Sequence, residues 1–453
     1  MYSLLNNTIR TYIWLGILLY AILFVYWENS FSYYNVLNFF TFSSYAFVLW
    51  ISANWEECLY NSKQLSIIVL FYSLIFVWFY QDMSFCLTGN TYMFSVADSK
   101  SYDEISDNLL DLPTDKWIPF LAKMRWNYDD WGSPFFQTYM KCLFPSRYFV
   151  NFIYIVLGVC SANMLFSIGK RIMQVRNAYY ASLSYAIASF AMYFYGTYLK
   201  EVIMVFVVIL CYWIYYKYRG SEKKMALMLS VSISLLLFFF RPVVAMFIWL
   251  SFFSSVLFKK GKGTNFIFIL LVLIVIGVSS IFAIQDASRN YIHDGDLAST
   301  ANYVNASRFG IITSSISAFV GPFPNLLQIS KIVNPTAIFG SGLLFKMLLV
   351  LPFYKGLVLC LRNKDAIVMP LFVFCIVEML ALAVVNDGLE LRKAYPHVAL
   401  FFMASFWFIS KYDENVDEEI LQTKYYKRYN LLFYLSTFLI FGITLAWSSL
   451  RVL

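Results

Sequence analysis

The stretches ADSKSYDEISDNL (Ala97–Leu109) and YDDWGSPFFQTYMKCLF (Tyr128–Phe144) belong to one polar interval, Met83–Pro145, in a chain that is otherwise almost continuously apolar. A charged side chain near the centre of a bilayer costs roughly 2.5 to 3.5 kcal/mol on insertion scales. An interval this rich in Asp and Lys therefore cannot lie in hydrocarbon. We predict that it lies in water, at the mouth of a membrane-embedded body.

The composition is that of a polytopic membrane protein. Of 453 residues, 60% are hydrophobic and only 13% are charged, whereas soluble domains average about 25% charged residues. Apolar runs of about 17 to 22 residues are each long enough to cross a bilayer. They predict about thirteen spans, near residues 11–28, 36–53, 64–82, 147–167, 178–197, 201–217, 224–240, 242–258, 264–284, 340–361, 366–386, 395–411 and 430–449. The predicted fold is an all-α transmembrane bundle with two long outward-facing loops that carry short surface helices.

The distribution of Lys and Arg predicts the orientation of the chain. If the N-terminus is cytoplasmic, the short cytoplasmic loops are basic, as the positive-inside rule requires. These basic residues are Lys170, Arg171, Arg176, Lys217, Arg219, Lys223, Lys224, Lys259, Lys260, Lys262, Arg362, Lys364, Lys424, Lys427 and Arg428. Topology thus explains the net charge of +8, and no nucleic-acid partner is needed to account for it.

The spans and loops divide the chain into five segments. They are N-terminal helices (1–82), a first outward loop (83–145), a helical core (146–284), a second outward loop (285–338) and C-terminal helices (339–453). The first apolar run has no small-residue cleavage pattern, so we interpret it as a retained span. Five of the seven cysteines lie in or beside apolar runs, which favours packing over disulfides or metal binding.

The first outward loop contains a predicted surface helix and a candidate acid. Ser101 and Glu104 match a capping box, and Tyr102, Ile105 and Leu109 follow at helical spacing, which predicts an amphipathic helix on the membrane surface. Asp98 would lie at its entrance, either as a simple cap or as a functional acid.

Three tryptophans of the same loop, Trp117, Trp126 and Trp131, have two interpretations. They are typical of an interfacial aromatic belt, and equally of a platform that stacks on sugars.

Other candidate residues fall on the same predicted side of the membrane. Lys200 and Glu201 lie where one span ends and the next begins; a Glu in a first helical turn is stabilised by the helix dipole, but an acid at a membrane boundary is also a functional candidate. Arg241-Pro242 is the predicted fold point of residues 225–258, because proline suits the first turn of the following helix. Arg241 can snorkel to lipid phosphate or bind the phosphate of a substrate. The last outward loop adds Arg392.

The second outward loop and the spans contain three further signals. His293, Asp294 and Asp296 resemble a D-x-D metal cluster, although Asp-Gly is also an ordinary turn signal. The Gly-Pro-x-Pro element near Phe319 and Phe323 predicts a bent, extended segment at the membrane boundary. Glu378 is the clearest acid within a span, and its role is left open.

Several chemistries are excluded by what the sequence lacks. There is no Walker A motif, no G-x-G-x-x-G, no H-E-x-x-H, no CxxC pair and no G-x-S-x-G. Two histidines are too few for a multi-His metal site. Acids are sparse within the spans, which argues against a transporter with a charged path through the bilayer.

The order of motifs resembles that of the polytopic GT-C glycosyltransferases. A D-S-x-x-Y motif (Asp98, Ser99, Tyr102) in the first large outward loop is followed by W-G-x-P-x-F (Trp131–Phe136) and by the RPVVA hairpin, with a weaker echo at LRKAYPHVALFF. The resemblance covers roughly residues 98–258. The sequence departs from the family in placing the Asp motif after the third predicted span, where the family has it after the first.

The resemblance implies an enzyme that moves a sugar from a polyprenyl-phosphate donor to a hydroxyl of a glycan, lipid or protein on the outer side of the membrane. In such enzymes an acid of the first outer loop is the general base, which corresponds to Asp98 here. We assign Arg241 with Arg392 or Lys200 to the phosphate. Tyr102 is assigned to substrate binding, and the acceptor or metal contacts are assigned to Asp129, Asp130 and Glu201.

The resemblance also implies partners and a location. The expected partners are a lipid-linked donor, a glycan or lipid acceptor and membrane lipids, with no protein partner evident; the expected location is a bacterial inner membrane. The sequence leaves open whether a divalent cation is needed. Two alternatives remain: a polysaccharide polymerase or ligase, which relies on arginines in outer loops, and a non-enzymatic flippase for lipid-linked sugars, for which no internal repeat is evident.

Overall fold

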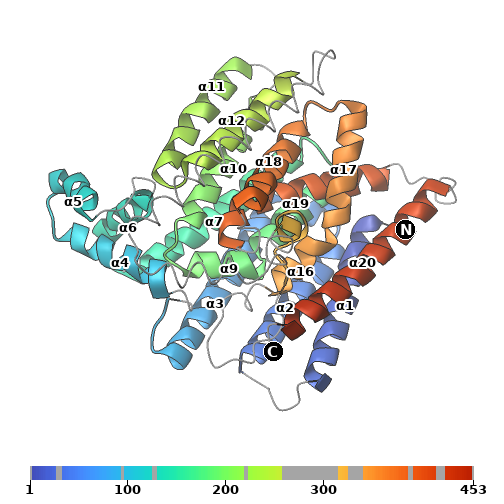
Figure 1. The fold of residues 1–453 in the computed structure, drawn as a ribbon, viewed down its shortest axis with the longest axis horizontal. Helices are drawn as coiled ribbons and strands as arrows, with labels where there is room; N and C mark the ends of the chain where they lie inside the picture. Colours follow the sequence, from blue (N-terminus) through green and yellow to red (C-terminus); the bar gives the residue numbers. More distant parts are fainter. Residues whose placement is uncertain are drawn as a thin grey trace.

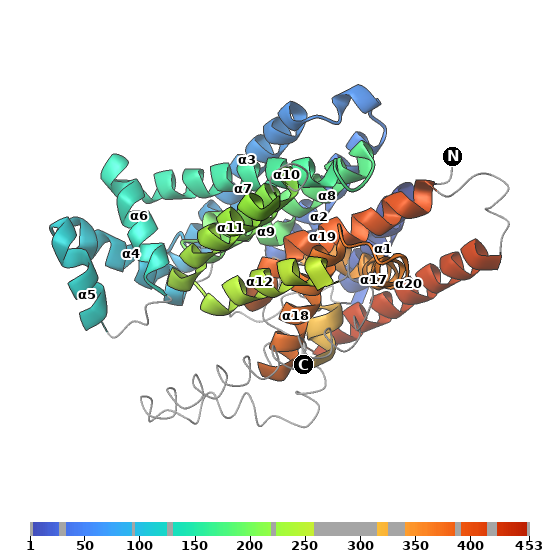
Figure 2. The same cartoon turned by 90° about the horizontal axis from the view of Figure 1, so that it is seen from above.

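The computed structural model describes residues 3–26, 33–92, 96–124, 130–218, 223–257, 315–324, 340–385, 391–414 and 424–450. Within these ranges the regular secondary structure is entirely helical (Figures 1 and 2). The predicted all-α class is therefore confirmed for the described part of the chain.

The first half of the chain forms α1 (Leu4–Tyr26), α2 (Tyr33–Ala53), α3 (Ser62–Thr88), α4 (Val96–Leu110), α5 (Trp117–Lys123), α6 (Gly132–Leu143), α7 (Arg147–Gly169), α8 (Val175–Ala186), α9 (Ser189–Gly196) and α10 (Glu201–Lys217). The second half forms α11 (Lys223–Ser234), the 3-10 helix η5 (Leu235–Phe239), α12 (Pro242–Leu257), α16 (Gly340–Leu348), α17 (Val350–Asn363), α18 (Met369–Val385), α19 (Leu391–Glu414) and α20 (Lys424–Leu450).

Several helices have the length and apolar composition to cross a membrane. Among the described residues four stretches qualify, Ser62–Cys86, Arg147–Gly169, Gly340–Asn363 and Lys427–Trp447, and α9 with α10 would add a fifth if that bent pair is one span. Three shorter apolar helices accompany them. The chain is thus compatible with a membrane protein, whereas the total of about thirteen spans stays a prediction and the span at 264–284 lies outside the described residues.

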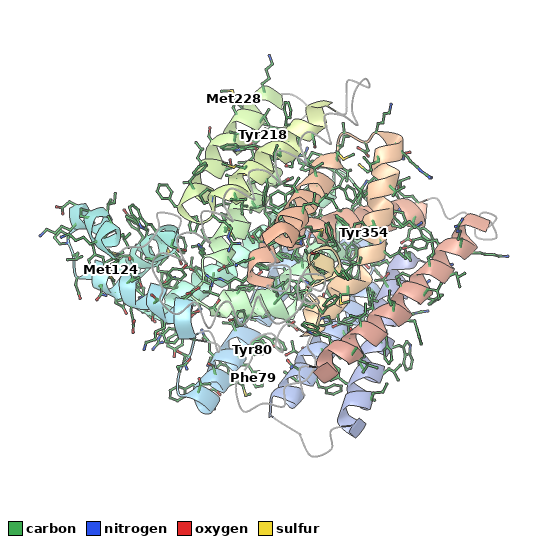
Figure 3. The ribbon with its side chains drawn as sticks, viewed as in Figure 1. Phe79, Tyr80, Met124, Tyr218, Met228 and Tyr354 are labelled. Atoms are coloured by element: carbon green, nitrogen blue, oxygen red, sulfur yellow. The ribbon has the colours of Figure 1, made fainter. Side chains whose placement is uncertain are left out.

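The outer surface of the bundle suits lipid. Large apolar side chains point outward, including that of Met228 on α11, which is 71% exposed (Figure 3). Phe438 on α20 is 77% exposed. Extended apolar surface of this kind is rare on soluble monomers. It is the surface expected of helices whose solvent is hydrocarbon.

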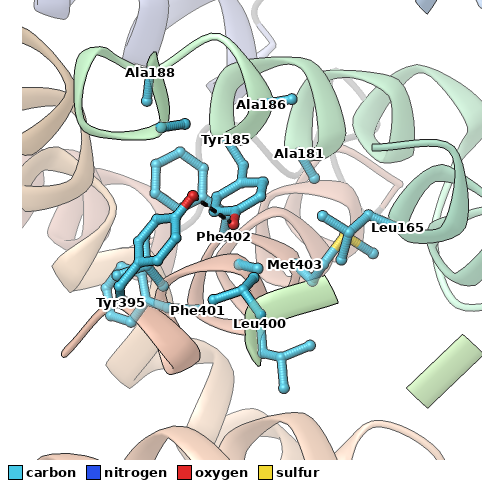
Figure 4. Packing of buried hydrophobic residues seen from close by; sticks show 14 of the residues in the cluster. Leu165, Ala181, Tyr185, Ala186, Ala188, Tyr395, Leu400, Phe401, Phe402 and Met403 are labelled. Atoms are coloured by element: carbon cyan, nitrogen blue, oxygen red, sulfur yellow. Dashed lines mark hydrogen bonds between the residues drawn. The ribbon is translucent and has the colours of Figure 1, made fainter. Parts of the chain in front are cut away.

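Helix α19 forms the centre of the bundle and contacts α8, α10, α17 and α18 (Figures 1 and 2). Its side chains are buried along most of its length. Where α19 meets α8, the hydroxyl of Tyr185 donates a 3.1 Å hydrogen bond to that of Tyr395, and Phe402 packs edge-on against Tyr185 (Figure 4). The hydrogen bond satisfies two buried hydroxyls inside an otherwise apolar contact.

Two predicted span boundaries are wrong. The apolar run 178–197 is not one helix, because α8 ends at Ala186 and α9 starts at Ser189; every residue on both sides of this break is buried, so hydropathy alone gives no sign of it. Helix α3 runs beyond residue 82 to Thr88. Gly89 ends it in the left-handed conformation (φ 72°), which glycine adopts without steric cost.

The first outward loop folds differently from the prediction. Helix α4 begins at Val96, so Ser101 and Glu104 lie inside it and form no capping box; Glu104 instead pairs with Lys100 at 3.6 Å. The apolar side of α4 packs on α5 through Ile105 and Leu109. The predicted surface orientation is therefore wrong, because this side is covered by protein.

Both interpretations of the three tryptophans, an interfacial belt and a platform for sugars, are wrong for Trp117. Its side chain is buried, and its indole N–H donates a 3.0 Å hydrogen bond to the carbonyl of Leu112. Trp131 packs beside the same small core, and Trp126 lies outside the described residues.

The two remaining fold predictions have different outcomes. The turn at Arg241-Pro242 is confirmed, because α11 and η5 lie against α12, which begins at Pro242. The Gly-Pro-x-Pro element is only partly as predicted. Residues 315–320, which include Phe319, are helical rather than extended, and Phe323 packs on Trp447 of α20.

Residues predicted to share a side of the membrane lie together. The hydroxyl of Ser3 donates to Asp413, and Arg176 donates to Asn6, which joins three segments predicted to be cytoplasmic. The residues predicted to face outward gather at the opposite end of α7, about 35 Å away along a 23-residue helix. The grouping agrees with the predicted topology, while the assignment of the ends to outside and inside stays a prediction.

Two glycines test the packing of the bundle. A Cβ atom at Gly158 of α7 would lie 2.4 Å from the ring of buried Tyr195, whereas one at Gly442 of α20 would meet nothing within 4 Å. We expect Gly158→Ala to lower stability by about 1 to 3 kcal/mol through overpacking. Gly442→Ala should be neutral or slightly stabilising. Thermal unfolding in detergent measures both, and an unchanged midpoint for Gly158→Ala would contradict the α7–α9 contact.

Candidate functional site

A sharp bend between α9 and α10 forms the base of the candidate site. The two helix axes differ by 117°, and the connecting residues 197–200 are buried. A broken helix leaves backbone carbonyls without partners. Three amide side chains bind these carbonyls: Asn151 binds that of Tyr195 (3.1 Å), Gln81 that of Gly196 (3.1 Å) and Gln137 that of Tyr198 (2.7 Å).

The bend places Glu201 at the N-terminus of α10. Its side chain is completely buried, at a helix end whose dipole stabilises a carboxylate. Its Oε1 lies 2.5 Å from Nε of Arg392 and 3.9 Å from Nη2 of Arg241. Its Oε2 has no hydrogen-bond partner among the described residues.

Arg392 connects Glu201 to Asp98. Its Nη1 contacts Oδ2 of Asp98, which lies in the first turn of α4 and remains 49% exposed. Burial lowers the pKa of the Arg392 guanidinium, but the carboxylates of Glu201 and Asp98 raise it by more, so the net pKa is above its usual range. Arg392 therefore stays charged and connects two acids on separate helices, Asp98 and Glu201, which lie 103 residues apart in the sequence.

A second ion pair lies next to the first. Nζ of Lys200 contacts Oδ1 of Asp130, and the hydroxyl of Tyr102 donates a 2.9 Å hydrogen bond to the same oxygen. Tyr102 lies one turn after Asp98, so both side chains share a face of α4. Burial, together with the carboxylates of Asp130 and Glu201, raises the pKa of Tyr102 and keeps the phenol protonated.

The structure thus brings together seven of the eight residues that the sequence analysis singled out. We call this group the rim cluster: Asp98, Tyr102, Asp130, Lys200, Glu201, Arg241 and Arg392. Asp129 lies outside the described residues, as do His293, Asp294 and Asp296. The three acids and three bases balance in charge. In the described ranges no group of three or more His, Cys, Asp or Glu side chains is arranged to hold a metal ion.

A buried lysine that sequence reasoning missed fixes α4 in position. Nζ of Lys141 on α6 lies 2.7 Å from Asp103 and 2.6 Å from Asp107, and it donates to Ser106 at 2.6 Å. Lys141 is 4% exposed. No sequence signal indicated this role, because a single charge in a segment predicted to lie in water does not indicate which residues it will contact.

A second missed group lies within the apolar helices. Lys346 of α16 is fully buried, and its Nζ contacts the carbonyl of Gly321 and lies 4.9 Å from the ring centroid of Phe401. Nearby, Oε2 of Glu378 lies 3.6 Å from Nδ1 of His397. A lysine inside an apolar run is a recognisable signal, because such groups are costly in a membrane.

Comparison with protein-family models, with curated proteins and with solved structures gives no match. The functional interpretation therefore depends on the geometry of the rim cluster.

Removing one partner of a buried ion pair leaves a buried charge uncompensated, which costs roughly 3 to 5 kcal/mol. We therefore expect Glu201→Gln to destabilise the protein strongly. In a double-mutant cycle with Arg392→Gln, the coupling energy should be about 1 to 3 kcal/mol. Thermal unfolding measures each variant.

The exposed pair Lys100–Glu104 on α4 is the matched control, with side chains 50% and 60% exposed. Its coupling should be below about 1 kcal/mol. Equal coupling energies for the two pairs would mean that Glu201 and Arg392 do not interact as described.

Proposed function

We propose that this protein is an integral membrane glycosyltransferase that moves a sugar from a polyprenyl-phosphate donor to a hydroxyl of a glycan, lipid or protein. The observation that carries the proposal is the contact of Arg392 with both Asp98 and Glu201. It joins an accessible acid to buried charges from distant parts of the chain. Transfer from a phosphate donor needs this combination of a base and cations.

Asp98 is the proposed general base. Its half-exposed carboxylate accepts the proton of the acceptor hydroxyl while the acceptor oxygen bonds to the anomeric carbon of the sugar. The bond between that carbon and the donor phosphate breaks, and the phosphate leaves with the electron pair. The salt bridge to Arg392 orients the Asp98 carboxylate at the first turn of α4.

Arg241 is the proposed phosphate ligand. It is 25% exposed and lies 3.9 Å from Glu201, a looser contact than the 2.5 Å contact of Arg392. Its Nη1 donates a long hydrogen bond, 3.4 Å, to the carbonyl of Lys393. A guanidinium with donors to spare matches phosphate geometry and stabilises the charge that develops on the leaving group.

Of the remaining members of the rim cluster, Asp130 suits the acceptor, because its side chain is 31% exposed and its carboxylate can accept hydrogen bonds from sugar hydroxyls. Glu201 is completely buried, so it holds Arg241 and Arg392 in place and does not contact the acceptor. Lys200 is 8% exposed and bound to Asp130, so it positions that acid rather than the phosphate.

A polysaccharide polymerase or ligase is the second candidate. The meeting of two arginines from separate hairpins, Arg241 and Arg392, at one carboxylate favours it. Such an enzyme would use a diphosphate-linked oligosaccharide rather than a phosphate-linked monosaccharide. Labelled donors of the two kinds, supplied to the purified protein, distinguish the candidates.

Asp98→Asn tests the base. We expect transfer from a labelled polyprenyl-phosphate sugar to fall by about 10²- to 10⁴-fold, because the amide cannot accept the proton. Asp111→Asn, an exposed acid just after α4, is the control and should transfer at the wild-type rate. Wild-type transfer by Asp98→Asn, with the thermal midpoint unchanged, would refute the assignment.

The proposed orientation places the N-terminus in the cytoplasm and the rim cluster outside, in a bacterial inner membrane. Cys86 on α3 and Cys58 in the 54–61 connection are both exposed and lie at opposite ends of α3. In single-cysteine variants, a membrane-impermeant maleimide should label Cys86 in intact cells and Cys58 only after permeabilisation. The reverse pattern would invert the topology.

A further inference from the structure

A pocket of about 700 Å³ lies between the end of α3 and the start of α7, apart from the rim cluster. Trp78, Asp82, Phe85, Arg147 and Tyr148 line it, with the short segment Gly89–Tyr92. No residue of the rim cluster lines it. Its volume lies within the range of about 300 to 1,000 Å³ typical of small-molecule sites.

The pocket carries one positive and one negative group that do not pair. Nη1 of Arg147 donates a 3.0 Å hydrogen bond to the hydroxyl of Thr91, and the guanidinium lies 5.3 Å from the ring centroid of Tyr92. Within the described ranges, neither Arg147 nor Asp82 is in any of the ion pairs found within 4.0 Å. The pocket therefore contains a cationic and an anionic side chain that form no ion pair with each other.

The setting of the pocket is that of a membrane–water boundary. It lies at the ends of two helices that have the length and composition of membrane spans. Trp78, Phe85 and Tyr148 are 70%, 56% and 56% exposed, and they point to the surroundings of the bundle. Exposed Trp and Tyr at helix ends are typical of the depth at which lipid head groups lie.

We propose that this pocket binds the head group of a zwitterionic aminophospholipid, with the phosphate on Arg147 and the ammonium on Asp82. A guanidinium is a strong phosphate ligand. The aromatic rings beside Asp82 offer cation–π contacts to the ammonium. The phosphate of a lipid without an ammonium group would still be attracted by Arg147, but Asp82 would repel its negative charge. The site is separate from the proposed glycosyl transfer and does not depend on it.

Native mass spectrometry of the full chain in detergent tests the proposal, with phosphatidylethanolamine and phosphatidylglycerol as probes. We expect the wild type to retain phosphatidylethanolamine about five- to tenfold better, the effect of one charge-assisted hydrogen bond. Asp82→Asn should remove this preference by weakening phosphatidylethanolamine binding alone. Arg147→Gln should weaken the binding of both lipids. Arg147→Lys keeps the charge and should weaken binding less. It replaces Arg147→Gln in the experiment if that variant does not fold.

Lys170→Gln is the matched control, because it removes one positive charge at the other end of the same helix, and it should bind both lipids as the wild type does. Three results would overturn the proposal. They are an unchanged lipid preference in Asp82→Asn, unchanged binding in a folded Arg147→Gln, or an equal loss in Lys170→Gln. Displacement of the lipid by glucosamine 1-phosphate but not by phosphoethanolamine would also overturn the assignment to a lipid.

Discussion

The buried carboxylate of Glu201 is the group around which the end of the bundle that carries the rim cluster is organised. It is fully buried, yet it lies at a helix N-terminus and contacts two guanidinium groups. A buried charge is tolerated when it is paired and hydrogen-bonded. Arg241 and Arg392 supply the pairing, which fixes the hairpin before α12 and the start of α19 against α10.

A second set of interactions holds α4 and α6 against this centre. Lys141 pairs with Asp103 and thereby attaches α4 to α6, while Lys200 pairs with Asp130 beside the start of α6. As a result Asp98 is carried on a helix whose position is fixed by buried contacts, although its own side chain is half exposed. Rigid support for an accessible acid is a general requirement of catalytic sites.

The sequence analysis found the members of the rim cluster by their position, not by their contacts. Lys200, Arg241 and Arg392 stood out because charges at span ends are few in a chain this apolar. Asp98 stood out by its place before the predicted helix of the first long loop and by the D-S-x-x-Y motif. The roles of Lys141 and Trp117 could not be read in the same way. In a loop rich in charged and aromatic residues, no single residue signals which neighbour it will meet.

The sequence by itself determined the helical class, most of the helix positions and the grouping of the candidate charged residues at one end of the bundle, because apolar run length and the placement of charges are local properties of the chain. Only the tertiary structure decided the break between α8 and α9, the bend that buries Glu201 and the pairing of Arg392 with two acids. These features depend on contacts of amide and guanidinium groups with residues far away in the sequence, such as those of Asn151 with Tyr195 and of Arg392 with Glu201. The local sequence pattern does not predict such long-range contacts.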